Sequence, residues 1–230
     1  MAISIDTVYQ RVLTLANKEQ RGYITPQEFN LLANQAQMEV FEQYFYDQSQ
    51  QDKNLKNSTE FSNVDEILDE KISFFKEVQV LSVTAGVATL PVDMHRLGSL
   101  FYTTTLVEIE QVSEEEIMYL QQSPLAKPSL QTPAFVRNKH NRVVVYPSGL
   151  TGVSCNYVRR PVPVSWGYVV VNNDALYNST TSEHFELHES EASELVYLIL
   201  SLAGIVIAKP GLGTFADAQI NAQKTQEKQQ

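Results

Sequence analysis

The feature of this sequence that most limits its fold is an uncharged apolar segment near the C-terminal end. It comprises the fourteen residues Leu195 to Ala208, and the preceding residues 182–194 contain five glutamates but no lysine or arginine. Because the segment is apolar on every side of a helix, it predicts a helix that is buried on every side. Fourteen residues are fewer than the roughly 18–20 that cross a bilayer, so we predict burial in protein and no membrane span.

The composition is typical of a folded chain with a substantial core. Of the 230 residues, 43% are hydrophobic and 10% aromatic, which suffices for one domain or two small ones. The N-terminus lacks the basic region and cleavage site of a signal peptide. The single cysteine, Cys155, cannot form an internal disulfide and indicates folding in a reducing cytoplasm. We therefore expect a soluble protein that is made in the cytoplasm.

The first third of the chain predicts helices. The sharpest signal is the pair Thr25 and Glu28, which has the spacing of a capping box in front of an apolar stripe. Asp6 is available to cap an earlier helix. Helical spacing returns over residues 64–75 and again from about His188.

At about Lys76 the hydrophobic period changes from that of a helix to that of a strand. Short alternating segments follow, interrupted by a short helix that begins with the capping pair Ser113 and Glu116. The last of them, residues 168–177, predicts a hairpin that turns at Asn172–Asp174.

These segments together predict an α+β fold. We expect a helical domain of residues 1–75 and 184–230, in which the N- and C-terminal helices pack together. We expect residues 76–183 to form an inserted β-rich domain, an antiparallel β-meander.

The sequence contains no pattern typical of catalysis, cofactor binding or metal binding. His184 and His188 are four residues apart, as in a helical metal pair, but the HExxH order and a nearby third ligand are missing. Cys155 lies in an alternating segment, which favours burial over a role as nucleophile. Trp166 is interpreted as a packing anchor. The net charge of −10 gives no general attraction to nucleic acid. The residues therefore predict an acidic interaction protein that is not an enzyme.

Three segments of the chain carry a resemblance to a known family. They are "YITPQEFNLLANQAQMEVFEQYF" near the N-terminus, "FVRNKHNRVVVYPSGLTGVSCNYVRRPVPVSWGY" in the middle and "FELHESEASELVYLILSLAGIVI" near the C-terminus. Their order resembles that of bacteriophage head–tail connector proteins, the tail-tubular-A-like adaptors of short-tailed and crAss-like phages. The first and third segments are the more specific ones.

The resemblance implies a structural virion protein at the junction of neck and tail. Such adaptors form a homo-oligomeric ring, commonly of twelve copies, that binds the portal protein and other tail or neck proteins. The genome passes through the ring without sequence-specific binding, and an acidic lumen that repels phosphate is compatible with this.

The resemblance also suggests roles for two sets of residues. In the apolar helix, Leu195, Leu198, Leu202 and Ile205 would pack between neighbouring subunits, although a core helix within one subunit remains an open interpretation. Residues 209–230 follow a Pro-Gly break and have only a thin apolar stripe among glutamines. We predict that they form an arm that docks on the portal through Phe215 and Ile220; a tail without a partner is the alternative.

Two other functions stay open at the level of sequence. One is a different ring component of the tail or neck, which would share the composition and the lack of an active site. The other, more remote, is an uncharacterised hydrolase that uses His184, His188 or Cys155.

Overall fold

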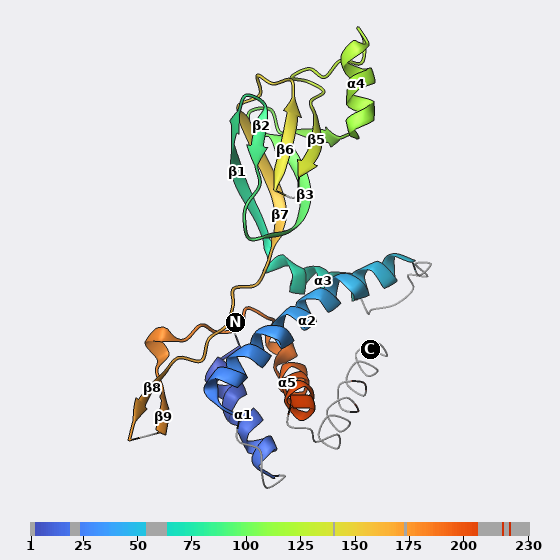
Figure 1. The fold of residues 1–230 in the computed structure, drawn as a ribbon. Helices are drawn as coiled ribbons and strands as arrows, with labels where there is room; N and C mark the ends of the chain where they lie inside the picture. The colour runs from blue at the N-terminus through green and yellow to red at the C-terminus, as the bar shows by residue number, and fades with distance from the viewer. Residues whose placement is uncertain are drawn as a thin grey trace. The chain divides into compact units, whose positions relative to one another are not determined.

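The structure, a computed structural model, describes residues 3–18, 24–53, 64–139, 141–172, 174–206, 218 and 221. The chain divides into two compact units, each of which is described here by itself. We call Phe75–Arg160 the barrel unit, and Met1–Phe74 together with Pro161–Gln230 the helical unit (Figure 1).

The helical unit contains four α-helices and one hairpin among its described residues. Its elements, with two short 3₁₀ helices, are α1 (Ile5–Lys18), α2 (Pro26–Lys53), α3 (Val64–Ser73), β8 (Tyr168–Val171), β9 (Asp174–Tyr177), η1 (Ser179–Thr181), η2 (Glu189–Glu191) and α5 (Ala192–Val206). Both α1 and α2 pack against α5, and α3 packs against α2. Large side chains from these helices, including Phe29, Phe41 and Leu195, are fully buried, and their burial is the main stabilising contribution to the unit.

Helix α2 begins as its sequence predicts. The Thr25 backbone N–H donates to Glu28 Oε2 at 3.0 Å, and the Glu28 N–H donates to Thr25 Oγ1 at 3.3 Å. This confirms the capping box. Because the Thr25 backbone and hydroxyl donate to the Glu28 carboxylate, they lower its pKa below the ordinary value.

The predicted cap of α1 was wrong. The helix starts at Ile5, and the Thr7 N–H faces Ser4 Oγ at 3.5 Å. Asp6 lies inside the first turn, where its carboxylate accepts a hydrogen bond from the Trp166 indole at 3.0 Å. The Asp6 side chain therefore binds Trp166, which is 160 residues away in the chain, and does not cap the helix as local spacing had predicted.

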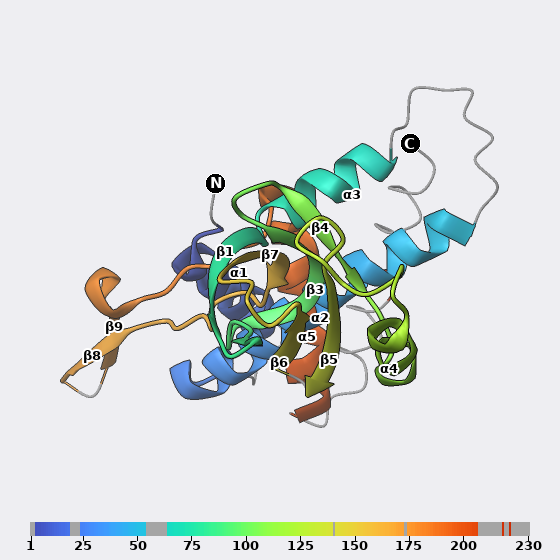
Figure 2. The same ribbon diagram turned by 90° about the horizontal axis from the view of Figure 1, so that it is seen from above.

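Among its described residues, the barrel unit contains seven strands and one helix. Its elements are β1 (Lys76–Thr84), β2 (Val87–Thr89), β3 (Met94–Tyr102), β4 (Val107–Gln111), α4 (Glu114–Gln122), β5 (Ala134–Lys139), β6 (Arg142–Tyr146) and β7 (Gly152–Arg159). The strands close into a barrel in the order β1-β2-β6-β5-β4-β3-β7 (Figures 1 and 2). Closure comes from β1, which pairs with β7 over Lys76–Ser82 and with β2 over Val83–Thr84.

The predicted fold of packed terminal helices with an inserted antiparallel β-meander is therefore wrong. In a meander each strand lies beside the next one in the chain, whereas β2 lies between β1 and β6, and β4 pairs with β5 in parallel. Helix α4 lies in the connection from β4 to β5, and a parallel pair requires such a crossover. Alternation along the sequence marks each strand but does not say which strand it pairs with, because the partners are far apart in the chain. The closed barrel also leaves no free edge of the kind a meander has.

The interior of the barrel is a continuous apolar core. Its largest fully buried members are Leu90, Met94, Leu100, Ile109 and Leu150. Outside it, α4 covers a smaller cluster through Ile117, which packs with Ala134 and Val136. The capping box of α4 is confirmed, since the Ser113 N–H donates to Glu116 Oε2 at 3.0 Å and the Glu116 N–H donates to Ser113 Oγ at 3.2 Å. The Ser113 N–H and hydroxyl, which both donate to the Glu116 carboxylate, lower its pKa.

Candidate functional site

A row of amide side chains on α2 holds the extended segment that leads to hairpin β8–β9. Asn34 Nδ2 donates to the Val164 carbonyl at 2.8 Å, and the Val164 N–H donates to Asn34 Oδ1 at 2.9 Å. One turn earlier Asn30 makes the same pair of bonds with Trp166, at 3.3 and 2.7 Å. Gln37 Nε2 donates to the Val162 carbonyl at 2.8 Å. The helix thus satisfies the backbone of residues 162–166 as a neighbouring strand would.

This row of amides was missed at the level of sequence. Its signal is the spacing of Asn30, Asn34 and Gln37 at i, i+4 and i+7, which places the three on one side of a helix. The row borders the buried apolar stripe, so it is placed to bind a polar backbone that packs beside the core.

Trp166 fixes the base of the hairpin to the helical unit, in agreement with its interpretation as a packing anchor. The side chain is 2% exposed, and its ring centroid lies 4.5 Å from that of Tyr9. Tyr168 and Tyr177, which pair across the base of the hairpin, have ring centroids 5.8 and 5.7 Å from Trp166. Aromatic contacts of this kind stabilise by roughly 0.5–1.5 kcal/mol each beyond area burial. The base of the hairpin is therefore rigidly placed.

Beyond its base, the hairpin exposes apolar side chains on both faces, and we call residues 168–177 the apolar arm. The predicted hairpin is confirmed, with Val169 paired to Leu176 and Val171 paired to Asp174. The exposed fractions are 51% for Val169, 61% for Val170 and 54% for Leu176. The pairing places Val169, Val171 and Leu176 on one face and Val170 on the other. A two-stranded hairpin is marginally stable alone, and clustered exposed apolar residues mark interaction surfaces.

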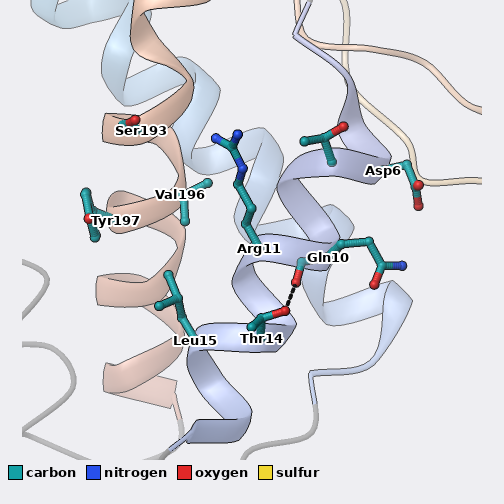
Figure 3. A pocket seen from close by; sticks show the side chains of 9 residues that line it. Asp6, Gln10, Arg11, Thr14, Leu15, Ser193, Val196 and Tyr197 are labelled. Carbon is teal, nitrogen blue, oxygen red and sulfur yellow. Dashed lines mark hydrogen bonds between the residues drawn. The ribbon is translucent and has the colours of Figure 1, made fainter.

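A pocket of about 560 Å³ lies between α1 and α5 of the same unit. Its polar lining residues are Asp6, Thr7, Gln10, Arg11, Thr14 and Ser193. Its apolar lining residues are Leu15, Val196 and Tyr197. Figure 3 shows Arg11 extending from α1 on the side that faces α5, with Leu15 and Val196 beside it. We call this the α1–α5 pocket; its lining combines apolar side chains with one cation, Arg11, and one carboxylate, Asp6.

The predicted packing residues of the apolar helix all lie on α5. Leu195 is fully buried within the helical unit, whereas Leu198 and Leu202 are half-buried. Ile205 belongs to α5, but its side chain is outside the described part. Phe215 and Ile220, the predicted anchors of the docking arm at 209–230, also lie outside the described residues. The roles of all six in contacts between subunits stay predictions.

The residues weighed for chemistry have structural partners. His184 Nδ1 accepts the Ile5 backbone N–H at 3.3 Å, and His188 Nδ1 lies 2.8 Å from Ser190 Oγ at the start of η2. Cys155 is fully buried in the barrel core, and burial raises the pKa of its thiol.

A buried ion pair joins α3 to the segment before α5. Lys71 Nζ bonds the Glu191 carboxylate, and the Glu191 side chain is 2% exposed. Glu191 lies in the first turns before α5, where a carboxylate also suits the positive end of the helix dipole. For Glu191 the structure gives a second reason, namely charge pairing inside the unit.

The described residues hold neither a cluster of potential metal ligands nor a helix of membrane-spanning character. In that part of the chain, no three potential metal ligands from His, Cys, Asp and Glu gather in one place. Among the described helices, none combines the length and the apolar character needed to span a membrane.

No protein-family model matches the chain, and no curated protein matches it significantly. The functional assignment therefore depends on the residues and geometry described above.

Proposed function

We propose that this chain is a structural, non-enzymatic virion protein. Copies of it form a ring at the junction of neck and tail, the ring joins the portal of the capsid to the tail, and the genome passes through it. Twelve copies, the number common in the family that the sequence resembles, would form such a closed cyclic assembly.

The observation that carries this proposal is the apolar arm. Half or more of Val169, Val170 and Leu176 is exposed, on a hairpin whose base is fixed by Trp166. A rigid element that presents apolar surface on both faces is suited to permanent contact with another protein. The resemblance of "YITPQEFN" and "FELHESEASELV" to the adaptor family supplies the kind of assembly.

The overall charge is compatible with the proposed passage of DNA. With a net charge of −10 the chain has no excess of cations to bind phosphates. A ring built from it would let DNA slide through its lumen without a sequence-specific contact.

The proposal is tested in intact phage particles. We expect gold-labelled antibodies against the chain to bind at the single vertex where the tail meets the capsid, once the particle is opened there. Quantitative mass spectrometry should find as many copies of the chain as of the portal protein. Label at the distal end of the tail would contradict the proposal in favour of a different tail component, and absence from purified particles would exclude any virion role.

A further inference from the structure

We infer that the apolar arm of one copy occupies the α1–α5 pocket of a second copy, with Asp174 at the arm's tip facing Arg11 in the pocket. This inference rests on the proposed ring and names the contact that builds it. It requires that the arm and the pocket lie on the same unit, that neither fills the other within one chain, and that their chemistry matches.

The arm and the pocket are distinct surfaces of the helical unit. The described lining residues of the pocket come from α1 and α5, and none of them belongs to residues 168–177. Yet Asp6, at one end of the lining, is the residue that bonds the Trp166 indole below the arm. The arm therefore begins close to the pocket of its own chain, but none of its described residues lines that pocket.

The charges of the two surfaces are complementary. Asp174 is the one acidic or basic residue in the sequence of the arm. Arg11 is the one cation among the described lining residues of the pocket. Both side chains are exposed, and neither has an ion-pair partner in the described part of the chain. Asp6 also lines the pocket, but its carboxylate accepts a hydrogen bond from the Trp166 indole N–H. Among the described residues, Arg11 therefore has no ion pair with Asp6 that Asp174 would have to displace.

The apolar parts also match. The arm carries Val170 and Val171 near its tip, and the pocket offers Leu15, Val196 and Tyr197. A volume of about 560 Å³ falls in the range of roughly 300–1,000 Å³ that encloses a small ligand. The pocket can thus take the tip of a hairpin whose four-residue strands are only about 13 Å long.

A second copy is the occupant that the local pair of Asp174 and Arg11 favours. The overall charge of −10 opposes self-association, so a contact between two copies requires surfaces of low charge with a matched pair. The arm and the pocket satisfy both conditions. Because they are different surfaces, the contact is head-to-tail, and such contacts form rings when the rotation closes.

A charge-exchange experiment tests this contact in the full chain. We would compare wild type, Arg11→Glu, Asp174→Lys and the double variant Arg11→Glu/Asp174→Lys by sedimentation velocity, with and without assembled portal rings. Each single substitution places two like charges opposite each other at the proposed contact. It should therefore weaken self-association about tenfold or more. The double variant restores an opposite pair and should recover association to within about threefold of wild type.

Two matched variants control for charge change as such. Arg142→Glu on β6 and Glu115→Lys on α4 make the same exchanges at exposed positions outside the arm and the pocket. We expect them to assemble as wild type does, and circular dichroism should show that all variants are folded.

The outcomes separate this inference from the proposed function. Single variants that assemble like wild type, or a double variant no better than the singles, overturn the arm-in-pocket contact and leave the ring proposal standing. A wild-type chain that stays monomeric alone and with portal rings overturns both. Assembly that stops at two copies contradicts the ring, while rescue by the double variant still supports the contact.

Discussion

Leu106 is held in a backbone conformation that suits glycine. Its φ is 55° in the turn between β3 and β4, and its side chain is 75% exposed. The left-handed region costs a residue with a Cβ roughly 1–2 kcal/mol, and little apolar burial offsets this cost here. Hydrophobic periodicity does not detect a single residue with positive φ, so this conformation was not predictable from the sequence.

We expect Leu106→Gly to raise the free energy of unfolding of the barrel unit by about 0.5–1 kcal/mol. The matched control is Leu125→Gly, because Leu125 is fully exposed in a loop and has no positive φ. That change adds only freedom to the unfolded chain and should be neutral or slightly destabilising. Urea unfolding monitored by circular dichroism measures both. Equal effects of the two substitutions would contradict strain at Leu106.

Tyr157 makes the stability of the barrel unit depend on alkaline pH. Its hydroxyl donates to Glu77 Oε2 at 3.1 Å and lies 3.5 Å from Asp93 Oδ2. Burial, the Glu77 hydrogen bond and the two negative charges raise its pKa to about 12. The unfolded value is about 10, so the folded state holds the proton more tightly. The resulting stability is fully present below pH 10 and is lost as the pH rises toward 12.

We expect the wild type to lose on the order of 2 kcal/mol of stability between pH 10 and 12 through this group. Tyr157→Phe keeps the ring but removes the titrating hydroxyl, so its stability should fall less over the same interval. Chemical denaturation at a series of pH values measures the difference. Parallel stability curves for the two proteins would show that Tyr157 titrates normally.

At the scale of the elements, the contact between α2 and the segment 162–166 decides where the apolar arm begins. Asn34 satisfies both backbone groups of Val164. Asn34→Ala leaves a partly buried N–H and a carbonyl without partners, and we expect a loss of about 2–3 kcal/mol. Trp166 should become more exposed, with red-shifted fluorescence. Gln35→Ala is the control, since this neighbouring amide is exposed and, within the described part of the chain, its side chain donates to Glu39 on the same helix. A loss no larger than that of the control would contradict the role of the row.

The ion pair between Lys71 and Glu191 joins α3 to the start of α5. Lys71→Met leaves a carboxylate buried without its charge partner, which costs roughly 3–5 kcal/mol. The double variant Lys71→Met/Glu191→Leu removes both charges and should recover most of this loss. Thermal unfolding of the two variants measures the coupling. If the double variant is less stable than Lys71→Met, the pair does not act as described.

Local signals in the sequence predicted how several elements begin and where strands occur. Thr25 with Glu28 and Ser113 with Glu116 are separated by three residues, so their contacts follow from helix geometry alone. The hairpin at 168–177 was also predictable from its two short runs and an asparagine turn.

Features that depend on distant partners were not predictable. The pairing of Lys76 with Val158 closes the barrel across 82 residues, and no periodicity records it. The hydrogen bond from Trp166 to Asp6, which replaces the expected cap, was likewise not predictable because the two residues are far apart in the chain. At the candidate site, the sequence indicated the hairpin, while the exposure of Val170 and the position of Arg11 in a pocket required the packed structure.

At the scale of the whole molecule, the central claim is assembly into a ring on the portal. A helical unit with an exposed arm on a fixed base and an open pocket has two surfaces that can each engage a neighbour. Repeated head-to-tail contact is the simplest way to use both, and closure of the rotation gives a ring.

Electron microscopy of the purified chain mixed with assembled portal rings tests this claim most directly. We expect class averages of a closed ring of the chain stacked coaxially on the portal, with the rotational symmetry of twelve subunits or that of the portal. Monomers before the portal is added would be compatible with the proposal, because the proposed ring is one that binds the portal. A chain that remains monomeric at every concentration and leaves portal rings bare would contradict the claim.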